Sequence, residues 1–177
     1  MIVALSALVW GSAARPPAQQ AAGVGPAPAP VDFSAFTPQA RADTLFNTVM
    51  WAHSRGDQGG VMNYGPMALE AYAALSVMTA DSRYHVGTIY SVAGPIEMAL
   101  VQADSLELAF PGHLFAAMLR GSVARVRQDT GALDQAFRSF LDNYDSEIGA
   151  GRSEYGEHTS TVNAFLAEAR EATGAGG

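Results

Sequence analysis

Residues 80–113 read ADSRYHVGTIYSVAGPIEMALVQADSLELAFPGH, and this stretch sets the pattern for residues 81–144 as a whole. It contains two helix-sized apolar patterns in succession, and the pair recurs 34 residues later in the chain. Small or apolar residues return to the same places: Gly87, Tyr90, Ala99, Ala103 and Leu106 are followed by Gly121, Ala124, Leu133, Phe137 and Phe140. A fixed period of this length predicts stacked helical hairpins.

The same residues resemble a tetratricopeptide repeat. If Ala80 is taken as the first position, Gly87 and Ala99 occupy the two positions that this family keeps small, because the two helices of a hairpin touch there. Pro111 falls where the family closes its second helix. The resemblance implies an all-α fold, a short TPR-like α-solenoid of about three helical hairpins with a C-terminal capping helix. It implies an architecture and no particular chemistry.

Composition divides the chain into four segments: an apolar segment (1–14), a Pro/Ala-rich extended arm (15–35), the helical domain (36–172) and a flexible tail (173–177). The first segment is typical of a secretory signal, with small residues at Ser12 and Ala14 before a cleavage site. The alternative is an anchoring plug in which residues 1–10 make shallow contact with a bilayer or a partner. As a helix, ten residues span only about 15 Å, half of a bilayer core.

The arm has no apolar face to bury, and its prolines favour extended polyproline geometry. We expect either a disordered linker or a partner-binding arm. In the second case the contacting residues are Trp10, Arg15, Pro16, Pro17, Pro28 and Pro30.

Turn and capping signals place the helices. Thr37 and Pro38 predict a helix start, and that helix should end at Gly56. A glycine pair predicts a loop over residues 57–64, after which Pro66 starts a second helix. The inward-facing residues of this second helix are expected to be Leu69, Tyr72 and Ala73.

The next hairpin should begin with Asp81 as the cap of a helix to Ala93, followed by a helix from Pro95 to about Phe110. A third hairpin should pair residues 112–127 with 130–148, and Ser153 should start one last helix. The apolar faces expected on the last two helices comprise Leu133, Phe137, Phe140, Leu141 and Tyr144, then Tyr155, Val162, Phe165, Leu166 and Ala169.

Composition excludes several kinds of chemistry. All ten basic residues are arginine and there is no cysteine, which rules out lysine and thiol catalysis, thiolate metal sites and disulfides. The net charge of −7 argues against a nucleic-acid partner. The one basic cluster, Arg120, Arg125 and Arg127, is predicted to be solvated or salt-bridged surface, with an acidic partner as the alternative.

A search for catalytic spacing gives no site. His53, His85 and His113 are far apart in sequence, whereas Glu154 and His158 lie four apart and could share one face of the last helix as an ion pair. A zinc site needs three or four ligands. We therefore predict no enzyme, no cofactor and no metal; an enzyme would need a pocket that gathers two of these groups with shifted pKa values.

The family resemblance implies a ligand surface on the concave face, lined by the first helix of each hairpin. The residues in that register are Phe46, Met50, His53, Tyr84, Thr88, Ser91, Val92, Met118, Ser122, Arg125 and Val126. The alternative is that the aromatic and methionine side chains among them are core.

These patterns favour a non-catalytic scaffold or assembly subunit that binds protein partners. We expect an extrinsic periplasmic subunit of a larger membrane complex; a bacterial photosynthetic reaction-centre and light-harvesting complex is one instance, since its extrinsic subunits also look like an arm plus a small domain. The alternative is a free periplasmic adaptor or peptide-binding module with a cleaved signal peptide.

Overall fold

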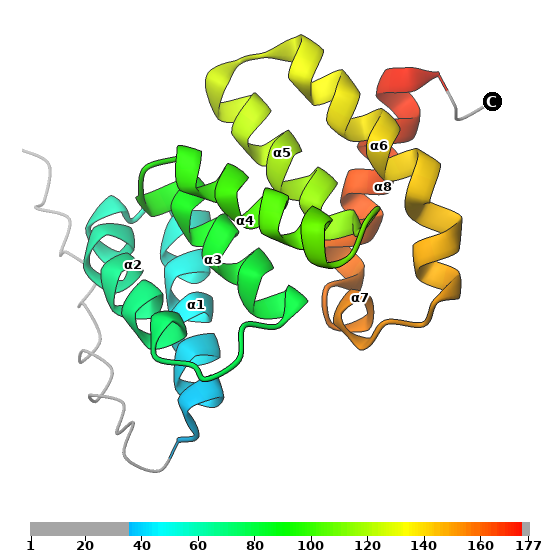
Figure 1. The fold of residues 1–177 in the computed structure, drawn as a ribbon. Helices are drawn as coiled ribbons and strands as arrows, with labels where there is room; N and C mark the ends of the chain where they lie inside the picture. The colour runs from blue at the N-terminus through cyan, green and yellow to red at the C-terminus, as the bar shows by residue number, and fades with distance from the viewer. Residues whose placement is uncertain (1–35, 175–177) are drawn as a thin grey trace, which may run out of the picture. The chain divides into compact units, whose positions relative to one another are not determined.

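The computed structural model describes residues 36–174, and these residues form only helices and the loops between them. The helices are α1 (Pro38–Ser54), α2 (Gln58–Ala73), α3 (Ala80–Ala93), α4 (Glu97–Ala109), α5 (Leu114–Arg127), α6 (Thr130–Gly149), α7 (Ser153–Glu157) and α8 (Thr159–Thr173) (Figure 1). The predicted all-α class is confirmed for this part of the chain. The expected signal segment and the arm lie outside the described residues.

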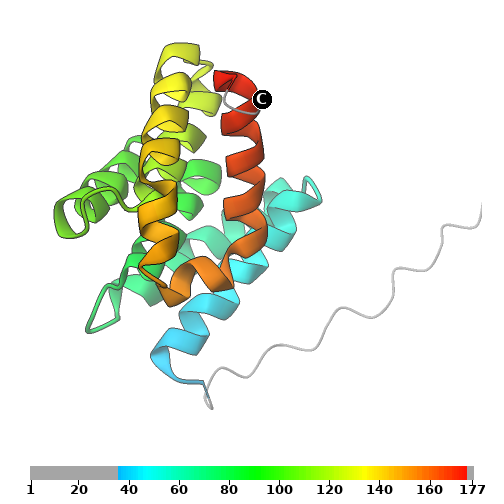
Figure 2. The same ribbon diagram turned by 90° about the vertical axis from the view of Figure 1, so that its right-hand side faces the viewer.

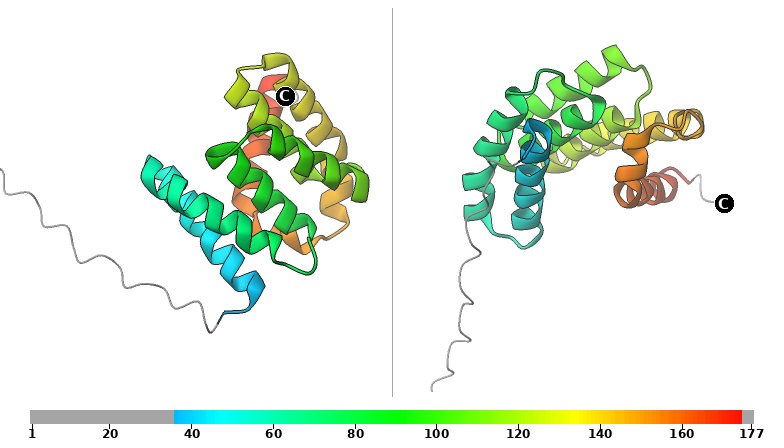
Figure 3. Two further views of the ribbon diagram at one scale, coloured as in Figure 1. Left: turned by 60° about the vertical axis from the view of Figure 1, so that its left-hand side comes forward. Right: turned by 90° about the horizontal axis from the view of Figure 1, so that it is seen from below.

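Consecutive helices pack in pairs, α1 against α2, α3 against α4 and α5 against α6. Figure 3 shows the first pair running side by side. Neighbouring pairs also touch, because α3 contacts α1, α2 and α5, and α4 contacts α5. At the C-terminal end α6 and α8 lie next to each other and are joined through α7 (Figure 2).

Helix α3 belongs to both apolar clusters of the described chain. Val86 and Ile89 pack with α1 and α2, whereas Tyr84 packs into a second cluster with residues of α4 to α8. This arrangement follows from the 3.6-residue period, which turns successive apolar positions of α3 toward different neighbours.

The predicted start of α1 is confirmed. The Thr37 hydroxyl accepts a hydrogen bond from the backbone N–H of Ala40 at 3.1 Å, and Pro38 is the first helical residue. The helix ends at Ser54, and Gly56 follows with a φ of 71°, a value that suits glycine.

The loop predicted over residues 57–64 is wrong, because α2 begins at Gln58. Asp57 caps this helix by accepting the N–H of Gly60 at 2.9 Å. Gly60 and Gly65 continue the helix, and at both positions an added Cβ would lie 2.9 Å from an alanine Cβ of a neighbouring helix. Pro66, expected at the helix start, lies inside α2. Of the residues predicted to face inward, Tyr72 is buried, Leu69 is half-buried and Ala73 is exposed.

Three other helix starts differ from the prediction. Helix α5, expected from residue 112, begins at Leu114 after the cap His113. The cap of α3 is Thr79, whose hydroxyl accepts the N–H of Ser82, so Asp81 lies in the first turn. The Asp81 side chain, which does not cap α3, can therefore contact another helix. The helix that follows begins at Glu97, two residues after Pro95.

The last helix, predicted to be continuous, is interrupted at His158, which separates α7 from α8. The predicted inward residues Tyr155, Val162, Phe165 and Ala169 are buried, and Leu166 is half-buried. Helix α8 runs through Thr173, one residue into the expected tail, and ends at Gly174 with a φ of 70°.

Candidate functional site

The break at His158 brings its imidazole to α3. His158 Nε2 lies 2.8 Å from Asp81 Oδ1 and 3.1 Å from His85 Nε2. His85 Nε2 in turn lies 3.5 Å from Asp81 Oδ1. Asp81 and His85 lie one helical turn apart on α3, so the three side chains converge on one point, and we call this group the histidine cluster. Within residues 36–174 it is the group of histidine and acidic side chains that could hold a metal ion.

A second set of contacts holds the ring of His85 from behind. The Tyr72 hydroxyl of α2 donates to Asp43 Oδ1 of α1 at 2.7 Å and lies 2.6 Å from His85 Nδ1. Because the one hydroxyl proton goes to the carboxylate, the Tyr72 oxygen accepts from His85 Nδ1–H. Phe46 stacks on the same imidazole with a ring separation of 3.8 Å. The ring of His85 is thus fixed in both orientation and tautomer.

Burial sets the electrostatics of this cluster. It lowers the pKa of His85 and raises the pKa of Tyr72, and Asp43 adds to the second effect. Burial alone would raise the pKa of Asp81, but the hydrogen bond from His158 and the nearby His85 hold it below its ordinary value. The folded chain therefore favours a neutral His85 beside an ionised Asp81.

A second polar cluster fixes the N-terminus of α5 to α7. His113 caps α5 by accepting the N–H of Phe115 through Nδ1, and its Nε2 lies 3.2 Å from Glu154 Oε1. The Tyr155 hydroxyl donates to Glu147 Oε2 at 2.6 Å. It also accepts the backbone N–H of the first residue of α5 at 3.0 Å. Histidines thus hold α7 at both of its ends.

We expect His113 to make stability depend on pH. Burial lowers its pKa, and this effect outweighs the hydrogen bond to Glu154 and the charges of Glu147 and Glu154, which act in the opposite direction, while the charge of Arg152 lowers the pKa slightly further. Between the folded-state pKa and the unfolded value of about 6.5, the unfolded chain binds more protons, so stability falls as pH falls through about 6.5. His113→Asn, which keeps a capping side chain, should give a shallower decline.

Urea denaturation at several pH values between about 7.5 and 5.5 measures that slope. His53→Asn is the matched control, because His53 is exposed and should leave the slope at the wild-type value. Equal slopes in wild type and His113→Asn would show that His113 does not contribute.

The residues predicted to line a concave face differ widely in exposure. Phe46, Tyr84 and Met118 are buried; Met50, Thr88, Ser91, Val92 and Ser122 are half-buried; His53, Arg125 and Val126 are exposed. The hydroxyls in the half-buried group donate to backbone carbonyls one turn earlier in their own helices. Only part of this set is therefore on the surface.

The C-terminal segment contacts two of these residues. The ring of Tyr84 lies 5.1 Å from that of His158, and Arg125 pairs with Glu168 of α8 and lies over the ring of Phe165. The C-terminal segment thus contacts Tyr84 of α3 and Arg125 of α5, two residues of the predicted binding face. The predicted arm contacts lie outside the described residues.

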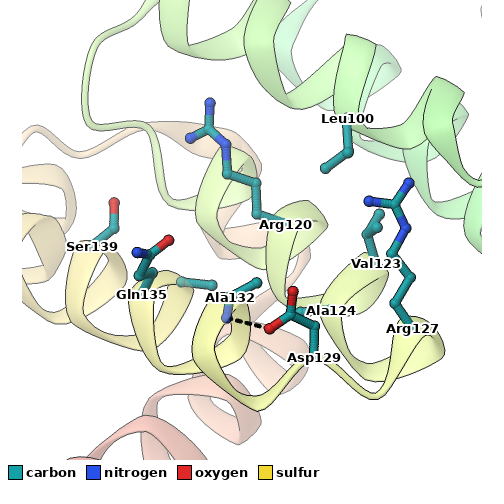
Figure 4. Close-up of a pocket in the computed structure, with 10 residues that line it drawn as sticks. Leu100, Arg120, Val123, Ala124, Arg127, Asp129, Ala132, Gln135 and Ser139 are labelled. Atoms are coloured by element: carbon teal, nitrogen blue, oxygen red, sulfur yellow. Dashed lines mark hydrogen bonds between the residues drawn. The ribbon is translucent and has the colours of Figure 1, made fainter.

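The prediction that the arginine cluster is salt-bridged is confirmed. Arg120 and Arg127 project from α5 around an apolar hollow of about 300 Å³ between α4, α5 and α6 (Figure 4). Arg120 pairs with Asp104 and Glu107 of α4, and Arg127 with Glu97 of the same helix. These carboxylates compensate both charges at the rim.

Helix α4 exposes an apolar stripe that is not among the surfaces predicted from the sequence. Met98, Val101 and Leu108 are 36%, 48% and 87% exposed, and their spacing places them along one face of the helix. In Figure 1, α4 lies in front of α5 and α8 lies behind it.

Glu154 and His158 do not share a helix face, so their predicted pairing is wrong. Glu154 pairs with His113, whereas His158 follows the end of α7 and pairs with Asp81.

No described helix has the length and hydrophobicity needed to span a bilayer. No known family model, curated protein or solved structure matches this sequence.

Proposed function

We propose that this chain is a non-catalytic scaffold subunit that binds a protein partner. The observation that carries the proposal is the exposed apolar stripe of α4, formed by Met98, Val101 and Leu108. Apolar side chains gathered on one exposed helix face are typical of protein interaction sites. A partner helix that covers this stripe would remove its apolar surface from water, which is the main driving force of association.

The architecture we propose is a short TPR-like stack of three hairpins, with α7 and α8 as its cap. Pairing of α1 with α2, α3 with α4 and α5 with α6, together with contacts between successive pairs, supports it. In such a stack the second helices lie on the outer side, where α4 exposes its stripe. We propose α4 and not the concave face as the partner surface, because Phe46, Tyr84 and Met118 of the concave set are buried.

The partner we propose belongs to a larger membrane-associated assembly outside the cytoplasm, with the N-terminal arm as a second point of attachment. Two attachment points raise the effective concentration of each contact. A free periplasmic adaptor with a cleaved signal peptide is the competing proposal. The two differ in whether the mature chain retains residues 1–14 and in whether it is found in a discrete assembly.

The test is a pull-down of the tagged full-length chain from gently solubilised native membranes, read by native mass and by N-terminal sequencing. We expect one discrete assembly with wild type, and at least a tenfold lower yield with Leu108→Glu, because a charge placed in the contact must be desolvated. Met62→Glu is the matched control, since Met62 is 63% exposed on α2 and outside the stripe.

Two outcomes contradict the scaffold proposal. Recovery of wild type as a soluble monomer favours the adaptor, and its N-terminal residue then shows whether a signal was removed. Equal yields of the assembly with wild type and Leu108→Glu would exclude α4 as the binding surface.

A further inference from the structure

We propose that Asp81, His85 and His158 bind a divalent transition-metal ion, with Zn²⁺ the best fit, and that this ion fastens the junction of α7 and α8 to α3. The proposal concerns a site different from the α4 stripe and does not depend on a partner. It rests on the geometry of the three ligand atoms and on the contacts behind them.

The spacing of the three ligand atoms fits a tetrahedral ion. A zinc ion with bonds of about 2.0–2.1 Å separates its ligands by about 3.3 Å. The separations here are 2.8 Å between His158 Nε2 and Asp81 Oδ1, 3.1 Å between His158 Nε2 and His85 Nε2, and 3.5 Å between His85 Nε2 and Asp81 Oδ1. An ion can therefore reach all three atoms after shifts of a few tenths of an ångström.

His85 is already prepared as a ligand. Its Nδ1–H donates to the Tyr72 oxygen, which leaves the lone pair on Nε2, the atom that faces Asp81 and His158. Tyr72 is itself anchored by Asp43, so a carboxylate, a phenol and an imidazole form one chain behind the ligand atom. Metal-binding histidines commonly have such a hydrogen bond on the second nitrogen, because it fixes the tautomer and the orientation of the ring.

The histidine cluster contains more hydrogen-bond acceptors than donors at its centre. His158 Nε2 carries at most one proton, but it faces two acceptors, Asp81 Oδ1 and the lone pair of His85 Nε2. One proton cannot point well at both. A cation placed between the three atoms would bind all of them, with His158 in the tautomer that carries its proton on Nδ1, and would balance the charge of the carboxylate.

The ligand types select the class of metal. Two imidazoles and one carboxylate suit zinc and its neighbours in the first transition series, whereas Mg²⁺ and Ca²⁺ prefer oxygen ligands throughout. Asp81 and Asp43 also line an open polar hollow together with Glu154 and Glu157, so a cation could reach the cluster from solvent through acidic surroundings. Three protein ligands leave the fourth position of a tetrahedral ion to water.

Zinc binding to the full-length chain tests the proposal directly. The protein is purified without a histidine tag, treated with a chelator and titrated with Zn²⁺ in a calorimeter. We expect one equivalent to bind and the thermal midpoint to rise with zinc concentration. Affinity should fall at least 100-fold in His158→Ala and in Asp81→Asn, and about 10–100-fold in Tyr72→Phe, which keeps the ring but loses the hydroxyl.

His53→Ala is the matched control, because His53 is exposed on α1 and lies outside the cluster. It should bind zinc as wild type does. Circular dichroism checks that each variant is folded, and nitrogen chemical shifts of the imidazoles provide a second readout in the wild-type chain, where His85 and His158 should shift with zinc and His53 should not. The absence of a stoichiometric site, unchanged affinity in His158→Ala, or shifts confined to His53 would overturn the proposal.

Discussion

Truncation of Phe165 to alanine is expected to lower the free energy of unfolding by about 3–5 kcal/mol. Phe165 is 5% exposed, and its ring lies 4.8 Å from that of Phe140 and 5.1 Å from that of Phe137 on α6. It also covers Gly121 of α5, where an added Cβ would lie 2.8 Å from the ring. One side chain of α8 thus fills the space between α5 and α6, and its truncation to alanine removes these contacts from the core.

Urea denaturation of wild type and Phe165→Ala measures this loss. Leu108→Ala is the control, because Leu108 is exposed on α4 and its truncation should change the free energy of unfolding by about 0.5 kcal/mol or less. A similarly small effect of Phe165→Ala would mean that α8 is not an integral part of the core.

The elements predicted best are those whose signals are local. Thr37 and Pro38 set the start of α1 through a side-chain cap and a fixed φ, which neighbouring residues cannot override. The apolar period of α6 is equally strong, and Phe137 and Phe140 are buried as predicted. Such helices can be predicted from the sequence because each cause lies within a few residues of its effect.

The predicted start of α2 is too late, at Pro66 instead of Gln58, because glycine has two uses. The pair Gly59–Gly60 is typical of a loop, yet Gly60 and Gly65 lie where helices approach closely. A single sequence does not distinguish a glycine that frees the backbone from one that admits a neighbouring helix. Asp57 was the signal that could have decided the case, since its carboxylate caps α2.

The histidine cluster could not be predicted from spacing, because His85 and His158 are 73 residues apart and meet only through packing of the C-terminal helices on α3. The predicted continuous helix also places His158 beside Glu154, whereas the break between α7 and α8 places it beside Asp81. The concave-face residues were assigned from repeat positions alone, which carry no information on distant helices. A single repeat indicates which positions face inward, but it does not indicate that Tyr84 and Met118 are buried in one cluster with residues of α8.

Replacement of Gly87 by leucine is expected to cost about 1–3 kcal/mol or more through overpacking of the core. An added Cβ at Gly87 would already lie 2.6 Å from Leu119 Cδ1, and leucine adds three further carbons. Ala99→Trp, at a fully buried position of α4, should have a comparable effect. Gly149→Leu is the control, because a Cβ at Gly149 meets no heavy atom within 4 Å. Denaturation midpoints compare the stability of all three variants with that of wild type. Wild-type stability of Gly87→Leu and Ala99→Trp would rule out the hairpin-repeat architecture.

The smaller substitution Gly87→Ala separates two reasons for a small residue at this position. The family resemblance expects Gly87 to admit α4, its own hairpin partner, but the three nearest atoms to an added Cβ all belong to Leu119 of α5. If the contact between hairpins decides, Gly87→Ala should cost less in a Leu119→Ala background than in the wild-type chain, because truncation opens the space that the new methyl needs. If the cost is the same in both backgrounds, α4 sets the limit instead. A double-mutant cycle on the free energy of unfolding therefore tests whether the small size of this residue serves the contact of α3 with α4 or the contact of α3 with α5.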